Sequence, residues 1–300
     1  MLTRRAALAA GLALLAPPLG ARAQAPGRIK AVATFSILGD LVRQIGGERV
    51  EVTTLVGPNG DAHVYSPTPA DGRRLADARV IFTNGLDFEG WIDRLVKSSG
   101  AKAPKVEASR GVKPLEDREG GHGHGSPDPH AWQSIGNAKI YAANIRDALI
   151  TADPEGKAAY EAQAASYLAR LDELEAEAKS LAARIPPERR RIITSHDAFR
   201  YFEAAYGIDF VSPQGVSTEA EASAKDVGRI IGQIRRERIA AVFVENISDA
   251  RLMERIAKET GARIGERVYS DALSEPGGPA GTYIDMMRHN IRAFSAALSS

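Results

Sequence analysis

The 300-residue sequence contains no cysteine. A chain without cysteine forms no disulfide, carries no lipid on a cysteine at a cleavage site, and offers no thiolate to a metal ion. Any metal site in this protein must therefore be built from imidazole and carboxylate groups.

An excess of basic residues is also missing. The chain has 39 Lys and Arg against 38 Asp and Glu, a formal net charge of +1. Three of the arginines lie in the first 23 residues, so residues 24–300 carry 36 basic and 38 acidic groups and a net charge of −2. We therefore expect no nucleic-acid partner, because such proteins present a basic surface.

Long apolar runs are scarce as well. The run from Ala6 to Ala16 is too short for an ordinary membrane-spanning helix. It follows Arg4-Arg5 and precedes Ala21-Arg22-Ala23, which fits the small-x-small cleavage pattern. We predict a signal peptide over residues 1–23, exported by the Sec or the twin-arginine route. The mature protein, starting at Gln24, is then free in the periplasm and not a lipoprotein.

Short apolar strands alternate with amphipathic helices in both halves of the chain. This alternation is typical of parallel sheets with helices on both faces, so we predict an α/β fold of two doubly wound lobes. The predicted strands are 30–35, 50–55, 79–85, 191–195, 208–211, 240–245 and 263–268. The predicted helices are 37–45, 69–77, 88–96, 198–206, 223–234, 250–260 and 283–298.

One long helix is predicted between the two halves. Asp153 and Pro154 suit a helix start, and Pro186-Pro187 suits its end. An apolar stripe runs along about thirty residues, or about 45 Å. We interpret it as a rigid brace, which gives an N-terminal lobe at 28–152, a linker helix at 153–186 and a C-terminal lobe at 188–300. The stripe consists of Tyr160, Ala164, Tyr167, Leu171, Leu174, Ala178, Leu181 and Ile185.

Residues 111–129 interrupt the pattern with glycine, proline and acidic residues. We predict a surface loop here. His122 and His124 within it fit a solvated tract better than an auxiliary metal-collecting segment.

Four residues are candidate metal ligands: His63, His130, His196 and Asp271. Each follows a predicted strand or lies in a loop between α/β units, and such loops form the ligand crevice of parallel sheets. Two come from each half, which predicts one metal site in the interlobe cleft. Three imidazoles and one carboxylate suit Zn²⁺, while Mn²⁺ prefers more oxygen ligands.

Each of these residues has an ordinary alternative. His63 fits a loop histidine, and His130 after Asp-Pro fits a turn. His196 fits a helix start, or a catalytic base beside Ser195, although adjacent strand side chains point to opposite faces. Asp271 fits a cap or turn. Their equivalent placement in both halves favours the metal site.

Five stretches of the sequence resemble the periplasmic metal-binding proteins of zinc and manganese ABC importers. They span the mature chain in order: Gly60-Asp61-Ala62-His63-Val64-Tyr65-Ser66-Pro67-Thr68-Pro69, Asp128-Pro129-His130-Ala131-Trp132, His196-Asp197-Ala198-Phe199-Arg200-Tyr201-Phe202, Ser217-Thr218-Glu219-Ala220-Glu221-Ala222-Ser223-Ala224-Lys225-Asp226 and Val268-Tyr269-Ser270-Asp271.

The resemblance implies a monomeric solute-binding protein that takes a divalent metal to an inner-membrane ABC permease. It also implies two lobes joined by a long helix, with the same four ligands in a three-His-one-Asp set. The chain departs from many members at Ser66, where they have Glu, and at Ala222, where they have Pro. Zn²⁺ is favoured as the transported ion, with Mn²⁺ as the alternative.

Two other functions compete with metal transport. A periplasmic metallohydrolase needs an open coordination position and a general base. Glu245 after the strand 240–245 is the one acid placed to act as that base, or else to support a ligand histidine. The chain has neither a His-Glu-x-x-His motif nor a Gly-x-Ser-x-Gly elbow, so we expect no enzyme. A binder of a non-metal solute would leave the histidines unexplained.

Overall fold

A computed structural model describes residues 27–116 and 127–299. The predicted signal peptide, His122 and His124 lie outside the described residues. Within the described parts of the chain, no helix combines the length and apolar character needed to cross a bilayer.

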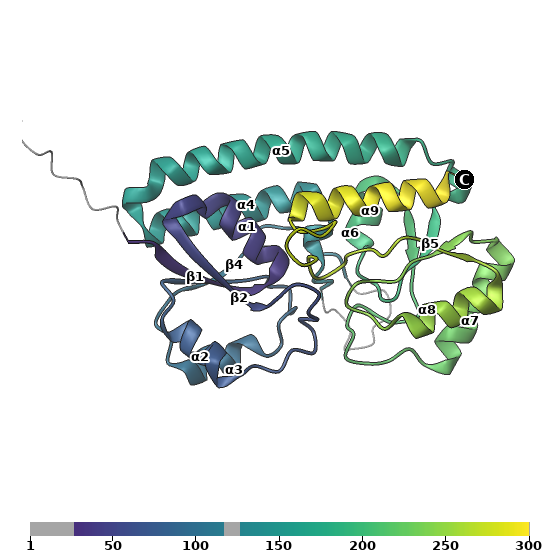
Figure 1. The fold of residues 1–300 in the computed structure, drawn as a ribbon, viewed down its shortest axis with the longest axis horizontal. Helices are drawn as coiled ribbons and strands as arrows, with labels where there is room; N and C mark the ends of the chain where they lie inside the picture. Colours follow the sequence, from purple (N-terminus) through teal and green to yellow (C-terminus); the bar gives the residue numbers. More distant parts are fainter. Residues whose placement is uncertain (1–26, 117–126, 300) are drawn as a thin grey trace, which may run out of the picture.

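The N-terminal lobe is built on a parallel sheet with strand order β2-β1-β3-β4. The strands are β1 (Ile29–Phe35), β2 (Val50–Val56), β3 (Val80–Thr83) and β4 (Lys105–Glu107). The last five residues of β1 and all four of β3 are buried, because the central strands are covered on both faces. The covering helices are α1 (Ser36–Gly46) and α4 (Ile135–Ala152) on one face, and α2 (Pro69–Ala76) and α3 (Ile92–Ser99) on the other (Figure 1).

The C-terminal lobe repeats the same plan, with strand order β6-β5-β7-β8. Its strands are β5 (Arg191–Ile193), β6 (Asp209–Val211), β7 (Ala241–Val242) and β8 (Arg263–Ile264). Its helices are α6 (Arg200–Tyr206), α7 (Ala224–Glu237), α8 (Ala250–Thr260) and α9 (Tyr283–Leu298). The predicted fold class of two parallel-sheet α/β lobes is confirmed.

The long helix α5 (Lys157–Ala183) runs past both lobes and lies beside α4 and α9 (Figure 1). Its buried stripe matches the prediction except near the end, where Ala182 is buried and Leu181 is partly exposed. Arg288 and Arg292 of α9 pair with Glu177 of α5, so ion pairs join the two helices. The predicted domain limits at 28–152, 153–186 and 188–300 remain a prediction.

The start of α5 differs from the prediction. Pro154–Gly156 form a 3₁₀ turn, and the α-helix begins only at Lys157. The Asp153 carboxylate does not cap it, because it accepts hydrogen bonds from Arg49 and from the Tyr160 hydroxyl.

Two elements were not predicted, and several strands are shorter than expected. Helix α4 contacts α1, α5 and the sheet, so its apolar residues do not form one stripe that the sequence reveals. The edge strand β4 has only three residues. In the C-terminal lobe, β7 and β8 pair over two residues, and one further bridge joins Glu245 to Val268.

Candidate metal centre

The four predicted ligand residues lie together between the lobes. His63 follows β2, His130 precedes the 3₁₀ turn Ala131–Gln133 that follows β4, His196 follows β5 and Asp271 follows β8. One donor atom from each lies within 4.8 Å of the others. The two parallel sheets therefore direct their carboxyl ends at a common point, where ligands bind in folds of this type.

Four of the separations among these donor atoms are close to those in a tetrahedral metal site. The Nε2 atoms of His63 and His130 are 3.3 Å apart. Asp271 Oδ2 lies 3.2 Å from His63 Nε2 and 3.1 Å from His196 Nε2, and Asp271 Oδ1 lies 3.6 Å from His130 Nε2. Ligands about 2.0–2.2 Å from a tetrahedral zinc ion are about 3.3–3.6 Å from one another.

The four side chains of this cluster are buried, although all of them are polar or ionisable. His130, His196 and Asp271 are fully buried, and His63 is 8% exposed. Both carboxylate oxygens of Asp271 and Nε2 of His196 lack a hydrogen-bond partner among the described residues, despite these short distances. Buried polar atoms are almost always satisfied, so a cation bound among them accounts for atoms that would otherwise be unpaired.

The charges of the site are strongly coupled. Burial lowers the pKa of His130, but the carboxylates of Asp271 and Asp128 outweigh it and raise that pKa to about 9. Burial likewise opposes the shift at His196, where Glu245 and Asp271 raise the pKa well above its ordinary value. Burial raises and the two imidazoles lower the pKa of Asp271, which ends well below its usual range. A metal ion entering the site must therefore displace protons from the imidazoles.

Carboxylates outside the cluster orient the histidines. Asp128 Oδ1 accepts a hydrogen bond from the His130 backbone N–H and lies 2.9 Å from its Nδ1. Glu245 Oε1 accepts a hydrogen bond from the His196 backbone N–H. Glu245 Oε2 lies 2.5 Å from His196 Nδ1, an ion-pair contact whose angles do not fit a hydrogen bond. Such contacts at Nδ1 select the tautomer that presents Nε2 to a metal. The supporting role considered for Glu245 fits this position.

Two residues that support candidate ligands, Asp61 and Asp128, were not predicted from the sequence. Asp61 and Asp128 each stand two positions before a candidate ligand, and Oδ1 of each accepts from the backbone N–H of that histidine at 2.9 Å. The repeated Asp-x-His spacing in the sequence could have predicted both supporting residues.

Aromatic side chains enclose the cluster on the N-terminal side. Phe88 packs edge-on against His63 with ring centroids 4.8 Å apart, and Trp132 against His130 at 5.3 Å. Trp132 Nε1 and Gln133 Nε2 both donate to the carbonyl oxygen of Ser270, which ties the His130 segment to the Asp271 loop. These rings exclude water, which strengthens electrostatic interactions inside the site.

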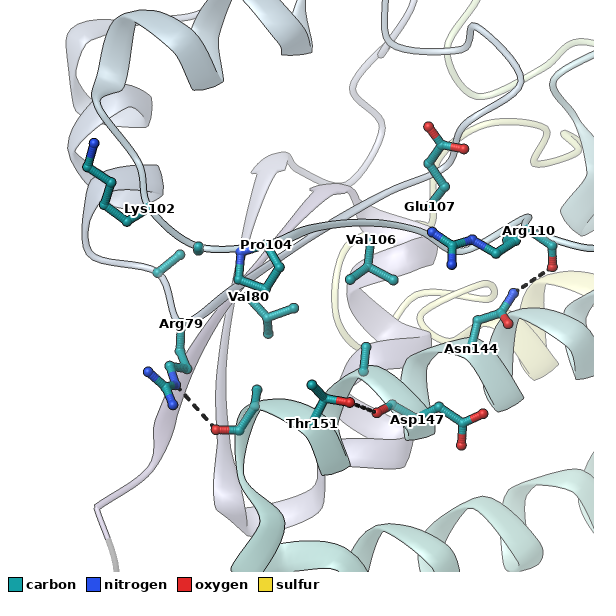
Figure 2. Close-up of a pocket in the computed structure, with 14 residues that line it drawn as sticks. Arg79, Val80, Lys102, Pro104, Val106, Glu107, Arg110, Asn144, Asp147 and Thr151 are labelled. Carbon is teal, nitrogen blue, oxygen red and sulfur yellow. Dashed lines mark hydrogen bonds between the residues drawn. The ribbon is translucent and has the colours of Figure 1, made fainter.

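A cavity of about 640 Å³ lies elsewhere, between α4 and the β3–β4 side of the N-terminal lobe (Figure 2). Val80, Pro104 and Val106 provide its apolar lining. Two of its polar side chains are bonded locally: Arg79 Nε donates to the Ala152 carbonyl and Asn144 Nδ2 donates to the Arg110 carbonyl. None of the four candidate ligands lines this cavity.

Comparison with known proteins agrees with this geometry. The family model described as zinc-uptake complex component A, periplasmic, matches residues 31–297. The manganese-binding lipoprotein MntA of Halalkalibacterium halodurans is 38% identical over 272 residues, covering 90% of this chain and 89% of its own. The iron ABC transporter substrate-binding lipoprotein MtsA of Streptococcus pyogenes is 33% identical over 278 residues, covering 91% and 89%.

A solved structure shows the same fold. The periplasmic zinc-binding protein TroA from Treponema pallidum superposes with a TM-score of 0.86 at 29% identity, covering 91% of this chain and 100% of TroA. The lobe architecture, the clustered His and Asp donors and the match over 31–297 lead to one conclusion: this chain belongs to the periplasmic zinc-uptake component A family.

Proposed function

We propose that this protein is the substrate-binding component of an ABC importer and carries one divalent transition-metal ion on His63, His130, His196 and Asp271. The observation that supports it most is a set of four buried donor residues, supplied by both lobes, whose donor atoms lie within 4.8 Å of one another. A bound ion then joins the lobes, and the permease receives it when they separate.

Zinc is the ion that the donors favour. Three imidazoles and one carboxylate in a tetrahedral arrangement suit Zn²⁺, whereas Mn²⁺ prefers more oxygen atoms and a higher coordination number. The relatives are named for manganese, iron and zinc, so Mn²⁺ is the alternative cargo.

We further propose that the mature protein works as a monomer in the periplasm and meets an inner-membrane permease there. The relatives MntA and MtsA are named lipoproteins, whereas this 300-residue sequence has no cysteine to carry a lipid.

The competing hypothesis of a metallohydrolase finds less support. Catalytic zinc uses three protein ligands and leaves one position for water. Here four residues each offer a donor atom within 4.8 Å of the others, and Glu245 is engaged with His196.

Metal titration tests the proposal directly. Protein stripped with a chelator is expected to bind one Zn²⁺ per chain, measured by competition with a chromophoric chelator and by elemental analysis. Parallel Zn²⁺ and Mn²⁺ titrations identify the preferred ion. Absence of tight binding to either ion would overturn the proposal, and metal-dependent esterase or phosphatase activity would favour the hydrolase.

Substitution Glu245→Gln tests how His196 is held. The neutral amide keeps the shape but removes the charge beside Nδ1, so Zn²⁺ affinity is expected to fall by roughly 10–100-fold. The matched control is Glu266→Gln, since Glu266 is exposed. Equal affinities of both variants and the wild type, in the same chelator competition, would remove Glu245 from the site.

A further inference from the structure

The segment that carries His63 belongs to the N-terminal lobe but is held by the C-terminal lobe. The Asn59 backbone N–H donates to the Leu273 carbonyl at 2.9 Å, and the Asn59 side chain accepts from Asn246 Nδ2 at 3.1 Å. Asn59 has a left-handed backbone with φ of 54°, which turns the chain sharply just before Gly60. Contacts across the lobe boundary therefore begin four residues before the candidate ligand.

A third contact between the lobes involves Asp61, which is bonded to His63 itself. Asp61 Oδ1 accepts from the His63 backbone N–H, and Asp61 Oδ2 accepts from the Thr218 hydroxyl at 2.6 Å. Thr218 lies 157 positions along the chain, in the segment between β6 and α7. One carboxylate thus joins a metal-ligand segment of one lobe to a loop of the other.

The equivalent acid at His130 lacks this connection. Asp128 also accepts from the backbone N–H of its histidine, but its Oδ2 has no hydrogen-bond partner among the described residues, and Arg200 NH1 is 3.9 Å away. Hydrogen bonds also cross the lobe boundary at the His130 segment, from Trp132 and Gln133 to the Ser270 carbonyl. Among the described residues, however, only Asp61 of these two acids accepts a hydrogen bond from the other lobe through its carboxylate.

The same side is where the site meets solvent. His63 is the one member of the cluster with measurable exposure. A cavity of about 530 Å³ is lined by Asp61 and Thr218 and also by Ser195, the neighbour of His196. The Ser195 hydroxyl is buried and has no hydrogen-bond partner within the described residues. The Asp61–Thr218 bond thus stands beside a polar cavity that reaches the segment of a second candidate ligand.

We propose that Thr218 is a positioning residue that, through Asp61, keeps His63 on the metal and limits the rate of metal release. The inference rests on the proposed function. While the Thr218 bond is intact, the Asp61 carboxylate is held from both sides and His63 is kept at the cluster. Once the bond breaks, the His63 segment loses a hold on the C-terminal lobe, and the most exposed ligand leaves first.

The test compares Thr218→Val with Thr218→Ser. Valine has nearly the shape of threonine but no hydroxyl, whereas serine keeps the donor. Protein loaded with one Zn²⁺ is mixed with excess chelator, and the release rate is followed by stopped flow. Hydrogen bonds to charged groups contribute enough that Thr218→Val is expected to release Zn²⁺ about 10-fold faster or more, with a similar association rate. Thr218→Ser should release it at nearly the wild-type rate.

A double-mutant comparison separates positioning from a general structural role. In an Asp61→Ala background, Thr218→Val is expected to cause no further acceleration, because its partner is already gone. Thermal unfolding of the metal-free variants should be the same for valine and serine. Equal release rates for Thr218→Val and wild type, or an undiminished effect of valine in the Asp61→Ala background, would overturn the role of Thr218. A wild-type protein that binds neither Zn²⁺ nor Mn²⁺ would instead overturn the proposed function itself.

Discussion

Replacing His196 by alanine is expected to weaken Zn²⁺ binding by at least about 100-fold, since the loss of a supporting residue alone typically costs 10–100-fold. The change removes the Nε2 atom that lies 3.1 Å from Asp271 Oδ2. It also leaves the fully buried carboxylate of Glu245 without the imidazole it contacts. Chelator competition at neutral pH measures the effect, and elemental analysis of the purified variant gives the residual metal content.

The matched control is His289→Gln. His289 is on α9, and its Nε2 lies 2.8 Å from the Arg267 carbonyl, a contact that the glutamine amide can replace. This variant should bind Zn²⁺ as the wild type does. Wild-type affinity in His196→Ala would contradict the ligand assignment, whatever the control shows.

The second large effect is expected from pH. In the metal-free protein the pKa of His130 is raised to about 9, and that of His196 is also raised well above its ordinary value. Below pH 9 the metal must displace the His130 proton, so each pH unit toward acid costs about tenfold in affinity for one proton. Zn²⁺ affinity should therefore fall by about 1000-fold or more from pH 8 to pH 5.

The slope of this pH dependence is the informative quantity. Because His196 also carries a displaceable proton, the logarithm of the affinity should change by more than one per pH unit over part of the range. Asp271 stays ionised throughout, since its pKa lies well below its usual range. Competition titrations at several pH values, corrected for protonation of the chelator, provide the measurement. An affinity that does not change between pH 8 and pH 5 would contradict the proton displacement.

The raised pKa of His130 affects the stability of the metal-free protein in the opposite direction to metal binding. The folded-state pKa of His130 exceeds the ordinary value of 6.5. Its contribution to the free energy of unfolding is therefore complete below about pH 6.5 and is lost as the pH rises to about 9. Acid favours the folded metal-free form through this group, while alkaline pH favours metal binding.

The repeating pattern of strands and helices makes the fold predictable from the sequence. Buried parallel strands such as β1 and β3 need continuous apolar runs, and these are visible in the sequence. Helix α4 is not visible there, because it packs against several elements at once and its apolar residues are not confined to one face. The short pairings of β7 and β8 also differ from the prediction, since pairing depends on neighbours that a local pattern does not contain.

For the site, the sequence by itself determined the available chemistry. With no cysteine, the metal donors had to be imidazole and carboxylate, and equivalent strand ends in both halves singled out His63, His130, His196 and Asp271. The distances of 3.1–3.6 Å among their donor atoms, and the resulting pKa shifts, exist only in the folded chain. Tertiary structure alone also paired Asp61 with Thr218, because a hydrogen bond across 157 positions requires both lobes in place.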